Sequence, residues 1–354
     1  MNILFTILNW GLGHAVRCIT LINYLQEKGH NISIASDGIA LDFLKKEFPE
    51  ASYFELPPYD IKYKFRFMPL NIIEKAPRII KTIVDEQKAV RNIVKEKNID
   101  LVINDNRMAC YHKDVPSIFI THQLTVPVPN QTLRKLTNFG HHYFMNKHDY
   151  CWIPDTEGNN NLAGEISRSD RKSPPKQYLG PITTIHLEQG KEDLPLLVVL
   201  SGPEPQRSYL EEKIINQASE LDNEIILIRG TNTDRTFKNK LPNLKILDLV
   251  DRKELAPLLE RAQKIICRSG YTSLMDFYIN PKPLFLIPTP GQWEQEYLAE
   301  HWFNTLGVPF ANQKDFNLVE AFNHAKEPKV EHKEAIFMEK IDELLNQINP
   351  YKTI

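Results

Sequence analysis

The chain has 354 residues, with 43 Lys and Arg against 45 Asp and Glu and a formal net charge of −2 at pH 7. Hydrophobic residues make up 42% and charged residues 25%, which is ordinary for a globular protein and excludes a mainly disordered chain. The near-zero charge gives no general reason to expect nucleic acid as a partner. At about 150 residues per domain, the length suggests two domains.

The first residues, the length of the apolar runs and the cysteines indicate a cellular compartment. Residues 1–8 run into a glycine turn with no basic segment and no cleavage site, so they predict a first strand and not a signal peptide. No apolar run approaches the roughly 18 residues of a spanning helix. The cysteines, at positions 18, 110, 151 and 267, form no zinc-ligand pattern and are typical of reduced thiols. We therefore expect a cytoplasmic protein, with peripheral contact at the inner face of a membrane left open.

The first half alternates short apolar runs with helical patterns. Ile3–Leu8 predicts a strand, Ala15–Lys28 predicts a helix, and Asn31–Ala35 predicts a second strand. The β-branched runs Asp100–Asn104 and Ser117–Thr121 predict two more strands. Strand, helix and strand in this order indicate parallel βαβ units with right-handed crossovers.

The same alternation starts again at residue 196. Strands are expected at 196–201, 224–229, 244–249, 264–267 and 283–287, with a helix at 210–221. Residues 157–195 are rich in Gly, Asn, Ser, Pro and charge, which favours a linker over 161–195. The fold class is therefore α/β, with doubly wound domains over 1–160 and 196–330 and a helix within 331–354. Ligands of such domains bind outside the carboxyl ends of the strands.

The first loop with chemical potential, Asn9–His14, follows the first strand. Gly11 and Gly13 let the backbone approach a ligand, and the helix N-terminus favours negative charge. A dinucleotide fingerprint needs a third glycine where Val16 stands, which weakens that interpretation. Because a turn has no structural need for imidazole, His14 is a candidate to accept a proton from an acceptor hydroxyl, with a binding or positioning role as the alternative.

Three loops of the second half, at residues 201–207, 268–276 and 287–297, also follow expected strands. The first suits a phosphate although two prolines remove N–H groups, the second suits a diphosphate at a helix start, and the third offers amide and carboxylate groups to sugar hydroxyls. Each of these loops, taken alone, is also typical of an ordinary helix start. With Gly11 and Gly13, the candidate donor-binding residues are Ser201, Gly202, Arg207, Arg268, Ser269, Gly270, Thr272, Ser273, Asp276, Gln292, Gln295 and Glu296.

In combination, GLGH, SGPEPQ, RSGYTSLMD and PTPGQWEQEYLAE resemble the GT-B glycosyltransferases, and within them the MurG-like branch with its UDP-N-acetylglucosamine-dependent transferases. The resemblance is strongest over residues 196–305. It implies two Rossmann-like domains around a cleft, with acceptor binding in the first domain and nucleotide-sugar binding in the second. It also implies that the C-terminal helix packs back on the first domain.

Carried over by position, the resemblance places Ser269 and Gly270 at the nucleotide diphosphate. Asp276 stands where the family has a ribose-binding Glu, and Gln295 and Glu296 stand where it has a Gln–Gln pair that reads the donor sugar. The opening loop and SGPEPQ both depart from the richer glycine loops of the family. The resemblance therefore implies the reaction class more firmly than the substrate.

The sequence has no DxD motif to hold a metal ion on the diphosphate. We therefore expect an inverting, metal-independent transferase with no cofactor, in which helix N-termini and Arg207 or Arg268 offset the charge of the leaving group. His14 would deprotonate the acceptor hydroxyl. Asp105 is a second candidate base, with capping of the next turn as its alternative, and Asp37 is a third.

Residues 62–97 hold ten Lys or Arg against four Asp or Glu, interleaved with apolar residues. Such a stretch is more often an amphipathic helix pair with a solvated basic face, and otherwise it is typical of contact with an anionic membrane that presents a lipid-linked acceptor. The expected function is transfer of a hexose or N-acetylhexosamine from a UDP-sugar to a saccharide or lipid-linked hydroxyl, in cell-envelope or surface polysaccharide synthesis.

Three alternatives remain. A UDP-sugar 2-epimerase shares the architecture, but it carries a DSGG-like loop where this chain has RSGY. An NAD-dependent oxidoreductase is disfavoured by Val16 and by the second set of nucleotide-like loops. A catalytically inactive sugar-nucleotide-binding protein is favoured by the altered loops at 9–14 and 201–206.

Overall fold

The structure, a computed structural model, describes residues 1–59, 68–158, 161–188, 190–232, 241–330 and 337–348. The side chains of residues 68–78 are also outside the description, so the basic stretch expected over 62–97 is described in full only from residue 79 onward. The chain divides into two units. The first comprises Met1–Asn161, Glu165–Ile182 and Ala335–Ile354, and the second comprises Leu162–Gly164 and Thr183–Glu334.

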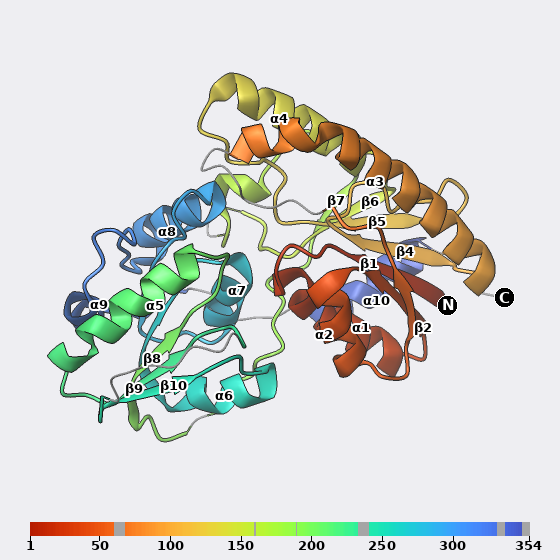
Figure 1. Cartoon of the computed structure of the whole chain (residues 1–354). Helices are drawn as coiled ribbons and strands as arrows, with labels where there is room; N and C mark the ends of the chain where they lie inside the picture. The colour runs from red at the N-terminus through yellow and green to blue at the C-terminus, as the bar shows by residue number, and fades with distance from the viewer. Residues whose placement is uncertain (60–67, 159–160, 189, 233–240, 331–336, 349–354) are drawn as a thin grey trace. The chain divides into compact units, whose positions relative to one another are not determined.

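The first unit is built on a parallel sheet with the order β3-β2-β1-β4-β5-β6-β7 (Figure 1). The strands are β1 (Asn2–Ile7), β2 (Asn31–Ser36), β3 (Ser52–Glu55), β4 (Leu101–Asp105), β5 (Ser117–Ile120), β6 (Tyr150–Ile153) and β7 (Lys176–Tyr178). β1 and β4 are almost entirely buried, as expected for central parallel strands that are covered on both faces.

Helices cover both faces of this sheet. They are α1 (Gly13–Glu27), α2 (Gly38–Glu47), α3 (Met68–Lys97), α4 (Gln131–Met145) and α10 (Phe337–Ile348), with a short 3-10 turn at Gly164–Ser167. In Figure 1, α1 and α2 lie on one side of the sheet and α3 and α4 on the other. α3 packs there through Val90, Ile93 and Val94, which form one cluster with Leu4 of β1.

The second unit has a five-stranded parallel sheet with the order β10-β9-β8-β11-β12. Its strands are β8 (Leu194–Val199), β9 (Ile225–Ile228), β10 (Leu244–Leu247), β11 (Ala262–Cys267) and β12 (Leu284–Leu286). Its helices are α5 (Gln206–Gln217), α6 (Arg252–Arg261), α7 (Tyr271–Ile279), α8 (Trp293–Leu306) and α9 (Leu318–His324), with a 3-10 turn at Ala218–Glu220. Leu196 and Val198 of β8 pack with Leu210 and Ile214 of α5.

Each sheet reverses its strand order once, between β1 and β4 in the first unit and between β8 and β11 in the second. Such a reversal leaves a crevice outside the carboxyl ends of the two strands, where open α/β sheets bind ligands. The loops at 9–13, 201–206 and 268–270 follow β1, β8 and β11. Three of the four loops selected from the sequence therefore lie at the reversal points.

Strands β3, β6 and β7 were not predicted from the sequence. β7 lies inside the stretch expected to be a linker, and it pairs in parallel with β6 to extend the first sheet. This strand, Lys-Gln-Tyr, is short, polar and half-buried, so it shows no alternation of apolar and polar residues that could be detected in the sequence.

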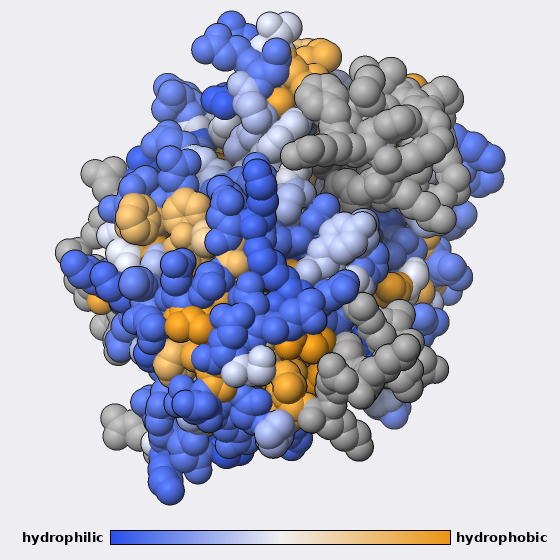
Figure 2. Space-filling model, turned by 60° about the vertical axis from the view of Figure 1, so that its left-hand side comes forward, coloured by the Kyte–Doolittle hydropathy of each residue, from blue (hydrophilic) through white to orange (hydrophobic). Residues whose placement is uncertain are grey.

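The face in Figure 2 is mostly hydrophilic, with hydrophobic side chains in small groups.

Candidate functional site

In the first unit, the candidate site begins in the loop between β1 and α1. Gly11 has φ of +80°, a left-handed conformation that glycine adopts without steric cost. Leu12 at the N-cap offers no side-chain hydrogen bond, and the first turn of α1 has no acidic residue. Gly13 is the first residue of α1, so His14 lies in the first turn of the helix and not in the loop.

His14 and Asp105, the two expected catalytic residues, contact each other. His14 Nδ1 lies 2.6 Å from Asp105 Oδ1 at the end of β4. Asp105 is fully buried, while 15% of the His14 side chain is exposed. Of these two side chains, only the imidazole of His14 therefore reaches the surface.

Two residues that the sequence analysis missed complete this cluster. Arg17 donates from Nε to Asp105 Oδ2 and from Nη2 to Asp105 Oδ1, each at 2.5 Å. Arg17 Nη1 also lies 3.4 Å from Nδ1 of His122, a buried residue that follows β5. The helical spacing of three residues from His14 to Arg17 was the available signal, whereas His122 had none because its position depends on the pairing of β5 with β4.

The protonation states follow from these contacts. Burial by itself raises the pKa of Asp105, but Arg17 and His14 outweigh it and hold that pKa well below its usual value. Burial, followed by the charge of Arg17, lowers the pKa of His14, and Asp105 offsets only part of this. Asp105 is therefore a carboxylate that only accepts, so its contact with His14 requires the hydrogen on Nδ1 and leaves the lone pair on Nε2. In this tautomer Arg17 Nη2, 2.9 Å from the same Nδ1, makes a close contact without donating to it.

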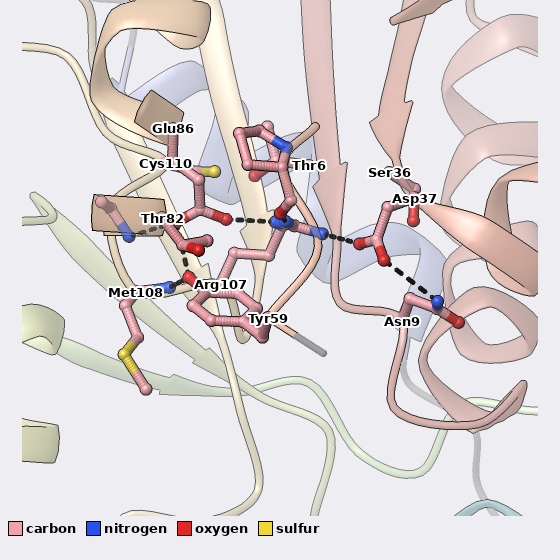
Figure 3. Close-up of polar contacts among 12 residues, drawn as sticks. Thr6, Asn9, Ser36, Asp37, Tyr59, Thr82, Glu86, Arg107, Met108 and Cys110 are labelled. Carbon is pink, nitrogen blue, oxygen red and sulfur yellow. Dashed lines mark hydrogen bonds and ion pairs between the residues drawn. The ribbon is translucent and has the colours of Figure 1, made fainter. Parts of the chain in front are cut away.

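Asp37, the third candidate base, is buried in a separate network (Figure 3). Arg107 Nη1 lies 2.5 Å from Asp37 Oδ1, and Arg107 Nε lies 2.5 Å from Glu86 Oε1. Asn9 Nδ2 donates to the other oxygen of Asp37 at 3.1 Å, and Tyr59 donates its hydroxyl to Glu86. Both oxygens of Asp37 are thus occupied, and the network holds the loop before α1 in place.

In the second unit, the three expected loops meet. Arg268 Nη2 donates to the carbonyl of Gln206, which joins the loop after β11 to the one after β8. Ser269 Oγ donates to the carbonyl of Gln295 at 2.7 Å, which joins the loop after β11 to α8. A Cβ on Gly202 would lie 3.2 Å from Thr289 Oγ1. Residues from three separate segments of the chain therefore surround one region of this unit.

Arg268 is a buried cation in that region. It is 1% exposed and hydrogen-bonds only neutral oxygens among the described residues, including the carbonyl of Ile287 and Gln313 Oε1, while its Nε has no partner there. Burial lowers its pKa to about 10. Thr289 Oγ1 is likewise buried without a described partner. Gly270 caps α7 without a side chain, and Thr272 and Ser273 lie half-buried in its first turn.

Other expected donor residues have partners within this unit. Arg207 is buried between Glu204 and Glu211, whereas Ser201 and Gly202 in the same loop are exposed. Asp276 accepts hydrogen bonds from both Nη groups of Arg252, at 2.6 and 2.8 Å. Arg252, on α6, is a further residue that the sequence analysis missed, because nothing local links it to α7.

The side chains expected to recognise the donor sugar form hydrogen bonds within their own loop. Gln295 Oε1 accepts from the backbone of Thr289 at 2.9 Å, and Gln295 Nε2 donates to Gln292 Oε1 at 2.6 Å. Glu296 Oε1 accepts from the backbone of Gly291 at 2.9 Å. These contacts fix the turn at the start of α8.

The described part of the chain holds neither a cluster suited to a metal ion nor a helix suited to crossing a membrane. No group of three or more His, Cys, Asp or Glu side chains there is placed to hold a metal ion. None of the helices described has the length and hydrophobicity needed to cross a membrane.

Known proteins resemble the chain along most of its length. Residues 1–147 match the family described as Glycosyl transferase family 1, and residues 197–345 match the Glycosyltransferase family 28 C-terminal domain. An uncharacterized glycosyltransferase of Methanosarcina acetivorans is 25% identical over 321 residues, which are 84% of this chain and 82% of that protein.

Solved structures share the fold. The glycotransferase of kitacinnamycin has a TM-score of 0.71 at 15% identity and 98% coverage of both chains. MurG of Acinetobacter baumannii has a TM-score of 0.59 at 12% identity, covering 98% of this chain and 100% of that one. The resemblance inferred from the motifs and the expected fold class are confirmed. The chain is a transferase with the GT-B fold, and it joins a segment that matches Glycosyl transferase family 1 to a segment that matches the Glycosyltransferase family 28 C-terminal domain.

Proposed function

We propose that this glycosyltransferase moves a hexose or N-acetylhexosamine from a UDP-sugar to a hydroxyl of a saccharide or lipid-linked acceptor, with inversion and without a metal ion. The observation that supports this most is the 2.6 Å contact between His14 and Asp105 outside the carboxyl ends of β1 and β4. A neutral imidazole with a free lone pair on Nε2 is a suitable general base near neutral pH.

In the proposed reaction, His14 Nε2 takes the proton of the acceptor hydroxyl as the hydroxyl oxygen attacks the anomeric carbon. The new glycosidic bond forms on the face opposite to the diphosphate, and the bond from the anomeric carbon to the diphosphate oxygen breaks. UDP leaves with that electron pair, so the configuration at the anomeric carbon inverts. Asp105 holds the Nδ1 hydrogen throughout and does not itself take the proton.

The second unit supports an anionic donor. Arg268 is a buried cation with no carboxylate within ion-pair distance among the described residues. The uncapped start of α7 at Gly270 adds the partial positive charge of a helix N-terminus. In the proposal, Ser269 and Gly270 contact the diphosphate and Asp276 contacts the ribose. Arg207 is the weaker of the two expected phosphate ligands, because Glu204 and Glu211 already neutralise it.

We extend the proposal to contact with an anionic membrane, which would present a lipid-linked acceptor for envelope polysaccharide. The described part of α3 exposes Ile80 and Val84. α4 exposes the large apolar side chains of Leu136, Phe139 and Tyr143. No acidic residue occurs on this helix. Arg134 and Lys135 on the same helix add positive charge.

Co-sedimentation with liposomes tests the membrane contact. The protein should pellet with vesicles that contain anionic lipid and stay in solution with purely neutral ones. A double Leu136→Ser, Phe139→Ser variant should lose this binding. Equal pelleting of the variant and the wild type, or no pelleting of either, would exclude α4 as the contact.

Calorimetry tests the donor. The protein should bind UDP in preference to GDP, dTDP and NAD, and EDTA should not change the affinity. Preference for dTDP would correct the nucleotide, and dependence on a divalent ion would exclude the metal-independent route. UDP binding without turnover on any donor and acceptor panel would identify an inactive sugar-nucleotide-binding protein.

A further inference from the structure

α1 presents three side chains to one carboxylate. His14, Arg17 and Cys18 are spaced at i, i+3 and i+4, so they share one face of the helix. His14 Nδ1, Arg17 Nη2 and Arg17 Nε all contact Asp105, and Cys18 Sγ lies 3.4 Å from Asp105 Oδ2. The carboxylate is therefore held at both oxygens by the helix that carries the imidazole.

The fork of Arg17 changes what Asp105 does to His14. In a simple His–Asp pair, the carboxylate favours the protonated imidazole. Here a guanidinium binds the same carboxylate in a bidentate pair and places Nη2 2.9 Å from His14 Nδ1. A protonated His14 would therefore be repelled by the nearby guanidinium. The carboxylate of Asp105 would offset this repulsion only in part, because it is already paired with Arg17.

The surroundings of His14 contain few other charges. The titratable groups that act on its imidazole are Arg17 on the same helix, Asp105 at the end of β4 and His122 after β5. Cys18 is fully buried and its thiol keeps its proton, because burial raises its pKa well above the usual value. Arg17 is therefore the one permanent cation among these groups.

We propose that Arg17 is a positioning residue for the proposed transfer: by holding both oxygens of Asp105, it fixes the orientation of His14 and keeps the imidazole in its neutral, proton-accepting form. This inference rests on the proposed function of His14 as the base. It gives Asp105 and Arg17 a joint role. The carboxylate orients the imidazole, and the guanidinium keeps the imidazole from being protonated before the acceptor binds.

The first test reads the imidazole without any substrate. The ring signals of His14 are followed by NMR from pH 4.5 to 8.5, and a His14→Gln variant identifies them. In Arg17→Met, the pKa of His14 should shift upward, because the nearby cation is lost while Asp105 remains. Arg229→Met removes a buried, carboxylate-paired arginine of the second unit and should leave the His14 titration unchanged. An unchanged titration in folded Arg17→Met would overturn the proposal.

The second test uses turnover. In Arg17→Met, the acid limb of the kcat profile should move to higher pH, so that activity falls more at pH 6 than at pH 8. Arg17→Lys keeps the charge but cannot bind both oxygens in a planar fork. It should retain nearly the wild-type His14 titration and lose kcat, with an unchanged KM for the donor. Wild-type kcat in Arg17→Lys would overturn the positioning role, including in the case where Arg17→Met does not fold.

The two tests separate this inference from the proposed function. If no nucleotide sugar is consumed by the wild type, the proposed transfer fails, yet the NMR titration still decides whether Arg17 controls His14. If transfer occurs and the titration does not move, the transferase stands and the role of Arg17 is excluded.

Discussion

Asn9 donates a hydrogen bond of 3.1 Å from its side-chain amide to Asp37, which ties the loop before α1 to the end of β2. The second oxygen of Asp37 binds Arg107. The same Asn9 side chain accepts from the backbone of Ala40 through its carbonyl oxygen. The loop that leads into His14 is therefore held by Asn9, whose side-chain amide nitrogen and carbonyl oxygen both form hydrogen bonds.

This anchoring predicts the effect of Asp37→Asn. The change weakens the bond from Arg107 and leaves that buried cation partly uncompensated, so the free energy of unfolding should fall by about 3 kcal/mol in urea titrations. Loosening of the loop should also lower kcat by roughly tenfold or more, because small misplacements of a catalytic group are costly. Asp42→Asn, at an exposed position of the same helix, serves as the control and should change neither quantity.

Removal of the proposed base predicts a separation between binding and turnover. His14→Ala should reduce transfer by ~10²–10⁴-fold while calorimetry gives a nearly unchanged UDP affinity. His324→Ala, at an exposed site on α9, is the matched control. If UDP affinity collapses and turnover survives, His14 is a binding residue and Asp105 becomes the candidate base.

The buried cation of the second unit predicts a loss of donor binding. Arg268→Met should weaken UDP binding by about tenfold or more, since hydrogen bonds to a charged group contribute about 1.5–3 kcal/mol. Arg268→Lys should recover part of it. Arg261→Met removes a surface arginine paired with Asp193 and should bind UDP normally. Equal affinity in Arg268→Met and the wild type would place the diphosphate elsewhere.

Asp276 is expected to contact the ribose, and it also binds Arg252 through both oxygens. Asp276→Asn should therefore lower the melting temperature and weaken UDP binding together. Arg252→Gln breaks the same pair without removing the carboxylate, so it separates the two effects. If UDP affinity depends on Arg252 and Asp276 equally, the pair is structural and the ribose contact is excluded.

His148 predicts a dependence of stability on pH. Burial lowers its pKa from 6.5 to about 4, so between these values the unfolded chain binds a proton that the folded chain does not. The free energy of unfolding should therefore fall as the pH drops from 6.5 to 4, by up to about 3 kcal/mol. His148→Gln should flatten this part of the urea-unfolding profile, whereas His324→Gln should not.

The central strands and the loops behind them could be predicted because they depend on local patterns. β1 and β4 are mainly apolar runs, Gly11 and His14 lie shortly after β1, and Asp105 is the last residue of β4. Arg252 and His122 could not be predicted, because their contacts depend on which strand or helix lies next to which. The partners of Arg207 were missed although a local signal was available, because Glu204 and Glu211 lie three and four residues from it in the sequence.

α10 belongs to the first unit although the whole second unit precedes it in the chain. Lys28 of the first unit pairs with its Asp342 at 2.6 Å, and its Lys340 donates to the carbonyl of Tyr178. During synthesis, the first unit must therefore wait for this helix until the second unit has left the ribosome. Apart from Leu162–Gly164, the second unit is formed by Thr183–Glu334. It can fold during that delay, so the unit made first is the last to be completed.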